Sequence, residues 1–128
     1  MVERRSIGSG SEWELRGGYS RAVVAGRQVF VAGTAPIMPD DADPPRDAYG
    51  QAKRCFEVIE AALEQAGGSL DDVVRTRIFL TNAAHAADVL RAHREAFPNT
   101  RPATSGLVVG LLDPRWMVEI EADALLSD

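Results

Sequence analysis

The stretch that decides the fold is residues 101–126, RPATSGLVVGLLDPRWMVEIEADALL. Its second half alternates strictly between apolar residues (Val118, Ile120, Ala122 and Ala124) and acids (Glu119, Glu121 and Asp123). Successive side chains of a strand point to opposite faces, so this period of two predicts a strand with one apolar and one acidic face. An acidic strand face is either solvated surface or one wall of a site, and the spacing alone leaves both interpretations open.

The first half of the same stretch predicts a second strand, which opens at Pro102. The dipeptide Asp113-Pro114 is typical of a turn, and in this interpretation it joins the two strands. If the two strands pair as a hairpin, the acidic face that carries Glu119 lies beside the segment that holds Thr104.

Ahead of these strands the pattern predicts the order strand, strand, strand, helix, strand, helix, and residues 1–128 are expected to form a single domain. Asp47 is the expected N-cap of the first helix, which ends at Gly67-Gly68. The second helix is expected to begin at a cap, Thr81 or Asn82, and to turn Val89, Leu90, His93 and Phe97 inward. The other expected segments are a hairpin turn at Gly26-Arg27, a strand over 72–81 and an extended amino segment over 11–16.

Several of the predicted strands are apolar on both faces. In residues 28–34, for example, Val29 and Val31 oppose Phe30 and Ala32. Two helices can cover only one face of one sheet, so the second apolar face needs another cover. Packing against identical copies is the simplest solution, and we therefore expect a closed homo-oligomer.

The composition is that of an ordinary globular chain, with 128 residues of which 45% are apolar and 26% charged. The 14 Lys and Arg against 19 Asp and Glu give a net charge of -5, which repels phosphate backbones, so nucleic acid is not an expected partner. The sequence has no apolar run of membrane-spanning length and no apolar leader at its amino end, so no membrane partner is expected. The single Cys55 excludes an intramolecular disulfide and favours a cytoplasmic protein, with Cys55 itself as core filler.

Metal and cofactor sites find little support in the sequence. His85 and His93 lie on one predicted helix without an H-E-x-x-H motif or a second cysteine, so no metal is expected and both are interpreted as satisfied helix histidines. Gly8-Ser9-Gly10 and Gly67-Gly68 are too short for a phosphate loop or a dinucleotide fingerprint. We therefore expect no cofactor.

An ordered set of short motifs carries a family resemblance. Gly18-Tyr19, Gly26 and the run VFVAGTAP at 29–36 resemble the G-x-Y, G and V-F-x-S-G-x-x-P signature of the Rid family, also called the YjgF or endoribonuclease L-PSP family. The match continues in order through Gln51, Ala66-Gly67, residues 72–74, Phe79, Pro102-Ala103 and residues 118–122. This resemblance implies an α+β, chorismate-mutase-like subunit, with a mixed sheet of about six strands and two helices on one face, and a homotrimer.

The resemblance also implies ligand sites in the clefts between subunits. The positions that match the family cleft are Tyr19, Ala32, Gly33, Thr34, Leu90, Ala103, Thr104, Ser105, Gly106 and Glu119. The best understood Rid proteins hydrolyse imines and enamines of amino acids, and an arginine in their P-A-R-S segment grips the substrate carboxylate. Thr104 stands where that arginine would be, and a neutral hydroxyl cannot replace a planar fork of donors.

Four other cleft positions depart from the family pattern as well: Ala32 replaces the usual Ser, Thr34 a common Gln, Leu90 a frequent Asn and Gly106 a frequent Cys. Arg101 and Arg16 are candidates for a substitute clamp, with Arg115 a weaker one, although arginines at such positions are usually solvated. Trp13 is interpreted as an aromatic wall, a lid or subunit packing.

Glu119 is the candidate catalytic residue. If a neighbouring subunit shields it, its pKa rises toward the range useful for a general base or acid; if it is exposed, it is a plain strand carboxylate. The expected function is binding of a small organic molecule, with hydrolysis or deamination of imine-, enamine- or carbonyl-type metabolites that does not use the carboxylate clamp. The alternative is a non-catalytic ligand-binding or chaperone-like trimer. An endoribonuclease, which the older family name suggests, is disfavoured by the acidic charge.

Overall fold

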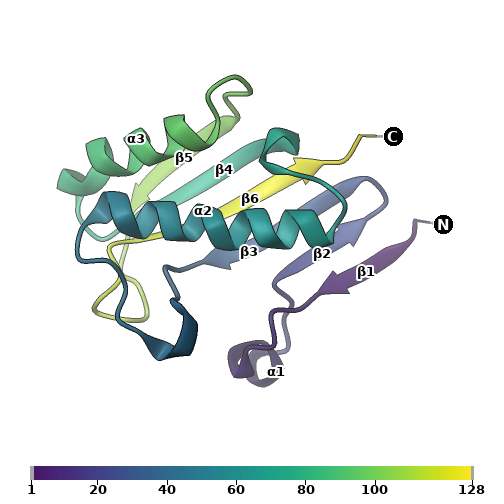
Figure 1. Ribbon diagram of the computed structural model, residues 1–128, viewed down its shortest axis with the longest axis horizontal. Helices are drawn as coiled ribbons and strands as arrows, with labels where there is room; N and C mark the ends of the chain where they lie inside the picture. Colours follow the sequence, from purple (N-terminus) through teal and green to yellow (C-terminus); the bar gives the residue numbers. More distant parts are fainter. Residues whose placement is uncertain (1, 128) are drawn as a thin grey trace.

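One six-stranded mixed sheet forms the framework of the molecule (Figure 1). The structure is a computed structural model that describes residues 2–127. The strands are β1 (Arg4–Ile7), β2 (Ala22–Ala25), β3 (Gln28–Thr34), β4 (Val73–Leu80), β5 (Ala103–Val108) and β6 (Val118–Leu125). They lie in the order β1-β2-β3-β6-β4-β5, and β4 and β5 form a parallel pair while the other neighbours are antiparallel.

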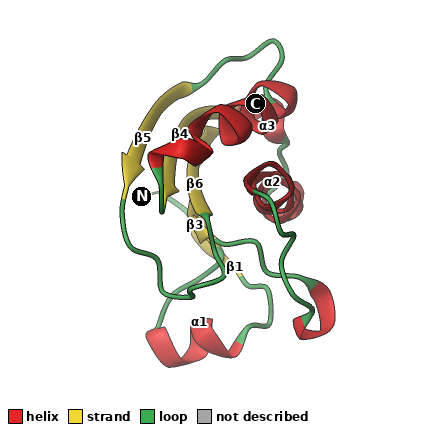
Figure 2. Cartoon of the chain, turned by 90° about the vertical axis from the view of Figure 1, so that its left-hand side faces the viewer, coloured by secondary structure: helices red, strands yellow, loops and turns green. Residues whose placement is uncertain are grey.

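Two helices, α2 (Ala48–Gln65) and α3 (Ala86–Ala96), cover one face of the sheet. Figure 2 shows both on the same side, and none of the described helices lies over the other face, which we call the open face. Between the layers, Ile59 and Leu63 of α2 belong to one buried cluster with Val29 of β3 and Ile120 of β6. The predicted α+β arrangement of about six strands with two helices on one face is therefore confirmed.

The helix α2, which is the first helix that the sequence predicts, begins and ends at the expected residues. The Asp47 carboxylate caps α2 by accepting a hydrogen bond from the Gly50 N–H. Just past the last turn, Gly67 has a φ of 92°, in the left-handed region that favours glycine. Cys55 is completely buried within the α2 stripe, which confirms that it is a core residue.

The helix α3, which is the second helix that the sequence predicts, follows a short 3-10 turn, η3 (Ala83–His85). Asn82 caps this turn by accepting a hydrogen bond from the Ala84 N–H. Two other 3-10 turns, η1 (Pro39–Asp41) and η2 (Leu70–Asp72), lie in the connections on either side of α2. Along α3, Val89 and His93 are buried as expected, whereas Leu90 is 49% exposed. The inward orientation expected for Leu90 was wrong, because neighbouring helix residues point about 100° apart and Val89 occupies the buried side.

The last two strands do not pair with each other as a hairpin. β5 pairs in parallel with β4 at the sheet edge, and β6 pairs with β4 on its other side and with β3. The unit β4-α3-β5 is thus a parallel crossover, and the loop that contains Asp113-Pro114 carries the chain across β4 to the middle of the sheet. The apolar face of β6 explains its place, because a central strand buries that face completely.

The extended conformation predicted for the amino segment 11–16 is wrong as well, because this segment contains the short helix α1 (Glu12–Gly17). The Ser11 side chain caps it by accepting a hydrogen bond from the Trp13 N–H, and Gly18 ends it in the left-handed conformation. The Glu14 carboxylate is buried and accepts hydrogen bonds from the Ser9 N–H and hydroxyl. A single helical turn and a half held by local caps lacks the apolar period that would have marked it as a helix.

The open face is mixed in character. Phe30 of β3 and Leu107 of β5 are 45% and 46% exposed. Between them, Arg77 of β4 forms ion pairs with Glu121 and Asp123 of β6, at 3.1 and 3.4 Å. Within residues 2–127, no helix is long and apolar enough to cross a membrane.

Candidate functional site

Glu119 lies on the open face of β6, with Phe79 of β4 as its register partner. On the other side of β6 the pairing with β3 shifts between Val31 and Thr34, and the Glu119 carboxylate lies against Gly33 at this shift. A Cβ atom added at Gly33 would come within 2.9 Å of Glu119 Oε2, which is closer than real side chains approach. Glycine at this position therefore lets the carboxylate lie directly on the backbone.

Arg21 brings a positive charge to the same place. Its Nη2 donates hydrogen bonds to the carbonyl oxygens of Ala32 and Gly33, at 2.7 and 2.8 Å. Its Nε is buried. Among residues 2–127 it is the one buried side-chain nitrogen or oxygen without a hydrogen-bond partner. The guanidinium therefore holds the irregular end of β3 and still has donor capacity left.

Partial burial raises the pKa of the Glu119 carboxyl above its usual range. The positive charge of Arg21 opposes this rise, and the negative charge of Glu121 adds to it. A carboxyl group with increased proton affinity, fixed beside a cation, has the properties of a general base or acid acting on water.

Tyr19 follows directly on the end of α1, and its backbone N–H donates to the Glu14 carbonyl oxygen at 3.0 Å. Tyr19 is 48% exposed, and both Tyr19 and Glu119 interact electrostatically with Arg21, which lies two residues further along the chain. The turn after α1 thus delivers Tyr19 and Arg21 to the end of β3 where Gly33 and Glu119 meet. We call this group, Tyr19, Arg21, Ala32, Gly33 and Glu119, the glutamate half-site.

A second group lies on the other side of the sheet, at the β5 edge. The Thr104 hydroxyl turns toward the helix layer, where its Oγ1 lies 2.8 Å from Thr76 Oγ1 and 3.3 Å from His93 Nε2. Leu90 of α3 is half exposed, and a Cβ atom at Gly106 would meet no atom of the described chain within 4 Å. We call this group, Thr76, Leu90, His93, Thr104 and Gly106, the threonine half-site.

The cleft residues inferred from the sequence therefore separate within one chain. Thr104 and Glu119 lie on two strands that β4 separates, and on opposite faces of the sheet. Thr76 of β4 pairs with Thr104 of β5 and with Ala122 of β6, so these three residues share one face. The acidic residues of β6 alternate with Ala122 and therefore point to the other face. Ala103 and Ser105 lie on the other face of β5 from Thr104 and are exposed. Thr34 is completely buried and donates its hydroxyl to the Ala32 carbonyl oxygen at 2.8 Å, so its side chain supports the end of β3 from the helix side.

Comparison with known proteins identifies the family. Residues 10–126 match the family described as Endoribonuclease L-PSP. The chain belongs to this family, which is also called the YjgF or Rid family. An uncharacterised protein of Streptomyces coelicolor is 40% identical over 121 residues, 94% of this chain and 90% of the relative. A RutC family protein of Pyrococcus abyssi is 37% identical over 84% of this chain and 86% of its own length.

Solved structures agree with this assignment. Rv2704 of Mycobacterium tuberculosis, a member of the YjgF/YER057c/UK114 family, is 43% identical, with a TM-score of 0.89 over 97% of this chain and 100% of that chain. A putative endoribonuclease of Thermotoga maritima is 31% identical, with a TM-score of 0.82 over 96% of this chain and 93% of that chain. The Rid resemblance and the chorismate-mutase-like fold are therefore confirmed.

Among the described arginines of this Rid-family chain, Arg21 is the one whose charge shifts the pKa of the Glu119 carboxyl. Arg16 is exposed and pairs with Glu12 at 3.9 Å, and Arg115 is tied to Asp113 and Asp43 at 2.9 and 3.0 Å. These contacts hold the pKa of the Asp113 carboxyl below its usual range. Arg101 is exposed with a φ of 46°, just before β5, and Trp13 is 65% exposed on α1. Within the described residues, no group of three or more His, Cys, Asp or Glu is arranged to hold a metal ion.

The sequence did not indicate the contacts that Arg21 and His93 make. Arg21 matches no motif in the sequence, and its contacts with the Ala32 and Gly33 carbonyl oxygens depend on how the segment before β2 lies against the end of β3. His93 is a satisfied helix histidine, as expected from the sequence, but nothing in its own helix indicates that its partners are two threonine hydroxyls. Its partners lie 17 and 11 residues away in sequence, on β4 and β5.

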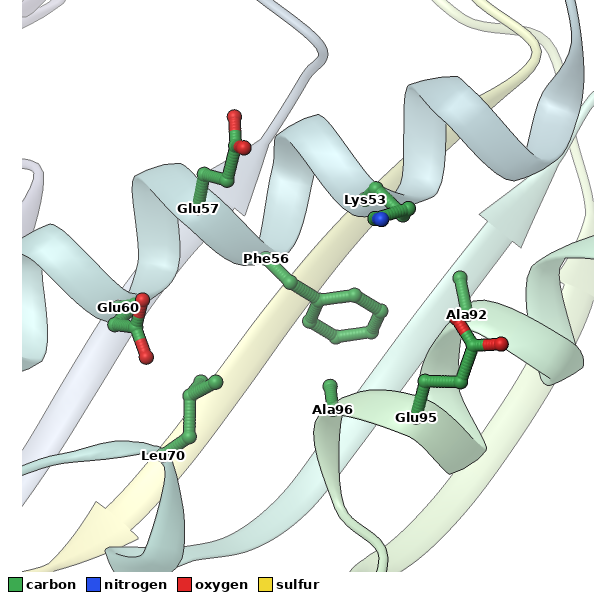
Figure 3. A pocket seen from close by; sticks show the side chains of 8 residues that line it. All are labelled: Lys53, Phe56, Glu57, Glu60, Leu70, Ala92, Glu95 and Ala96. Atoms are coloured by element: carbon green, nitrogen blue, oxygen red, sulfur yellow. The ribbon is translucent and has the colours of Figure 1, made fainter.

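A separate groove of about 260 Å³ runs between α2 and α3 on the outer side of the helix layer (Figure 3). Figure 3 shows the Phe56 ring pointing toward α3, with Glu57, Glu60 and Glu95 around it. The rings of Phe56 and His93 also pack in a T-shaped, edge-on geometry, with centroids 5.8 Å apart. The floor of the groove therefore shields the His93 side of the threonine half-site from solvent.

Proposed function

We propose that this Rid-family chain forms a closed homotrimer and hydrolyses the imine, enamine or carbonyl group of a small metabolite in clefts shared between subunits. The observation that carries this proposal is the Glu119 carboxyl, which lies against Gly33 beside the Arg21 guanidinium with a raised pKa. A structural carboxylate on a strand face has no need of a glycine beneath it or of a cation anchored to the neighbouring backbone.

The separation of the two half-sites supports the sharing between subunits. Within one chain the sheet itself stands between Thr104 and Glu119, so one chain cannot bring both to a single small ligand. A closed ring of copies can do so, because each subunit then presents its glutamate half-site to the threonine half-site of its neighbour. The half-exposed Phe30 and Leu107 on the open face give such copies apolar surface to bury.

The chemistry that fits the glutamate half-site is the addition of water to a polarised double bond. Glu119 removes a proton from water as the oxygen attacks the carbon of a C=N group, and the protonated carboxyl gives this proton to the nitrogen to form a carbinolamine. Glu119 then takes the hydroxyl proton of the carbinolamine and passes it to the nitrogen as the carbon–nitrogen bond breaks. The products are a carbonyl compound and ammonia, and no oxidant or reductant is consumed. Arg21, held by two carbonyl oxygens, supplies a fixed positive charge for the charge that develops on the substrate.

The substrate class follows from Thr104. Because a hydroxyl replaces the arginine that binds a carboxylate in the best understood Rid proteins, we propose that substrates here lack a carboxylate next to the reacting carbon. Losing one charged hydrogen-bonded pair costs about 2 to 5 kcal/mol of binding, or roughly 30-fold to several thousand-fold in rate.

Two imines test this proposal. The carboxylate-bearing 2-iminobutyrate is generated by an amino-acid dehydratase, and the neutral 1-iminobutane by an amine oxidase acting on butylamine. We expect the protein to accelerate hydrolysis of 1-iminobutane at least about 30-fold more than that of 2-iminobutyrate, and Thr104→Arg to gain activity on 2-iminobutyrate. Efficient wild-type hydrolysis of 2-iminobutyrate would contradict the substrate class and point to Arg21 or Arg101 as the clamp.

The same assay decides between an enzyme and a binding protein. If neither imine is hydrolysed faster than in buffer, the hydrolase proposal fails and the non-catalytic ligand-binding trimer takes its place. Light scattering on the purified protein at micromolar concentration measures the number of subunits in the assembly, independently of activity. About three subunit masses are expected, and a stable monomer would contradict the shared cleft.

A further inference from the structure

Three side chains of the threonine half-site form a continuous hydrogen-bonded chain. Thr104 Oγ1 lies 2.8 Å from Thr76 Oγ1, which in turn lies 2.8 Å from His93 Nε2. The distance from Thr104 Oγ1 to His93 Nε2 is 3.3 Å. The three residues come from β5, β4 and α3, so this arrangement is a product of the crossover unit as a whole.

This series of hydrogen-bonded side chains runs from the interior of the protein to its surface. Thr76 is completely buried, His93 is 9% exposed, and Thr104 is exposed at the sheet edge. The rings of Phe56 and Phe97 pack on His93, with centroids 5.8 and 4.8 Å from that of the imidazole. Only the Thr104 end of the chain is therefore positioned to meet a ligand.

Counting protons shows what the arrangement can do. Each hydroxyl carries one proton and two acceptor lone pairs, and a neutral imidazole has one acceptor nitrogen. With the imidazole proton on Nδ1, Thr76 donates to His93 Nε2 and accepts from Thr104. Thr104 Oγ1 also lies 3.0 Å from the Pro102 carbonyl oxygen. Because Thr104 has a single hydroxyl proton, it donates either to this carbonyl or to Thr76, and the second orientation completes the path to His93.

We infer that Thr104, Thr76 and His93 form a proton relay in which Thr104 contacts the ligand and His93 is the terminal base. The half-site then binds a neutral polar group, such as the water or the nitrogen of a neutral imine, where an arginine would bind a carboxylate. This inference rests on the proposed function, because it needs the cleft to hold a ligand.

The surroundings of His93 favour a neutral, proton-accepting imidazole. Burial lowers the pKa of its ring below the usual range. Lys53, Glu57, Glu60 and Glu95 of α2 and α3 line the groove beyond Phe56, Arg94 is the next residue of α3, and β5 has no charged residue over 103–108. Arg75 and Arg77 alternate with the buried Thr76 and so point to the open face of β4.

In the hydrolysis of a neutral imine the relay balances as follows. When the water oxygen bonds to the imine carbon, its proton moves to Thr104, the Thr104 proton to Thr76, and the Thr76 proton to His93. The imidazolium then returns this proton to the nitrogen, which gives a neutral carbinolamine. The second proton of the water moves from the carbinolamine hydroxyl to the nitrogen along the same path as the carbon–nitrogen bond breaks, so that a carbonyl compound and ammonia leave. The relay thus acts as a second acid–base group opposite Glu119 of the neighbouring subunit.

The tautomer of His93 tests the base without any substrate. Nitrogen NMR of the imidazole at pH 7 is expected to show the proton on Nδ1 and an unprotonated Nε2, with protonation only below the usual range of histidine. A proton on Nε2 would overturn the inference, because His93 would then donate to Thr76 and merely satisfy it.

Kinetics on 1-iminobutane test the relay itself. Thr104→Val and His93→Gln are expected to lower kcat by at least about tenfold and to remove the rise of rate with pH that His93 confers, while Thr104→Ser restores the rate. His85→Gln, the other histidine, is the matched control and keeps the wild-type rate. Unchanged kcat in Thr104→Val would overturn the relay. Loss of activity in Glu119→Gln alone would leave the proposed hydrolase standing without the relay.

Discussion

The glutamate half-site presents a carboxylate and a guanidinium on the open face of the sheet, whereas the threonine half-site presents a neutral hydroxyl backed by a buried imidazole. The first is held by backbone, through Gly33 and the carbonyl oxygens that Arg21 binds. The second is held by the core, through the packing of β4, α3 and β5. The charged groups thus lie on the face that the helices leave open, whereas Thr76 and His93 are buried under the helix layer and the Thr104 hydroxyl lies at the exposed sheet edge.

This difference gives the two half-sites different sensitivities. A group fixed by backbone contacts fails when the local backbone is changed, and the stability of the chain then alters little. A group fixed by core packing is coupled to folding, so its chemistry and the stability of the chain change together.

The largest expected effect is on turnover in Glu119→Gln. The amide cannot take up a proton from water, so we expect kcat on 1-iminobutane to fall by at least about 100-fold, with the fold and assembly retained. In the wild type the rate should rise with pH as Glu119 ionises, and this rise should lie above the usual pKa of a glutamate because its pKa is raised. Asp123→Asn, on the same acidic face, is the control. Equal kinetics in Glu119→Gln and the wild type would assign Glu119 to the solvated surface.

A smaller effect is expected when the backbone under the carboxylate is altered. In Gly33→Ala the new Cβ would lie 2.9 Å from Glu119 Oε2, so the carboxylate must swing aside. We expect turnover to fall about tenfold or more while stability falls by about 1 kcal/mol, because a flexible side chain can move away. Gly110→Ala meets no described atom within 4 Å and should change neither quantity. A Gly33→Ala variant with full activity would show that the close approach has no role in the site.

The smallest expected effect concerns the acid stability that His93 controls. Its folded-state pKa is depressed by burial, so the unfolded chain takes up this proton first as the pH falls. Neutral His93 therefore contributes to the free energy of unfolding above the unfolded-state pKa, near 6.5, and this contribution is lost as the pH falls below that value. Denaturant unfolding between pH 7.5 and about 5 should show a weaker pH dependence in His93→Gln than in His85→Gln, by less than about 1.4 kcal/mol per pH unit. Identical slopes would mean that His93 takes up its proton equally in both states.

Features that depend on neighbours in the sequence could be predicted from it. The cap at Asp47, the end of α2 at Gly67 and the alternation of β6 all appear in the structure because caps and periods are local properties of the chain. The positions of Gly33 and Glu119 followed from the family resemblance, but their contact did not, because it depends on the register between β3 and β6.

Strand order and cross-strand partners could not be predicted in this way. A turn at Asp113-Pro114 fits a hairpin as well as a crossing loop, and only the burial of the apolar face of β6 in the middle of the sheet distinguishes them. The Thr76 and His93 contacts of Thr104 depend on that same order. The separation of the cleft residues into two half-sites is therefore a property of topology, and local sequence carries no signal for it.

The central claim is that the two half-sites complete each other between copies, and subunit mixing tests it most directly. Glu119→Gln and Thr104→Val, each expected to be weak alone, are unfolded together, refolded as a mixture and assayed on 1-iminobutane against each variant treated alone. Random mixing in a ring puts an intact glutamate half-site opposite an intact threonine half-site in roughly a quarter of the clefts. We predict recovery of about that share of wild-type activity. A mixture that is no more active than the variants alone, although mass spectrometry shows mixed trimers, would contradict the claim.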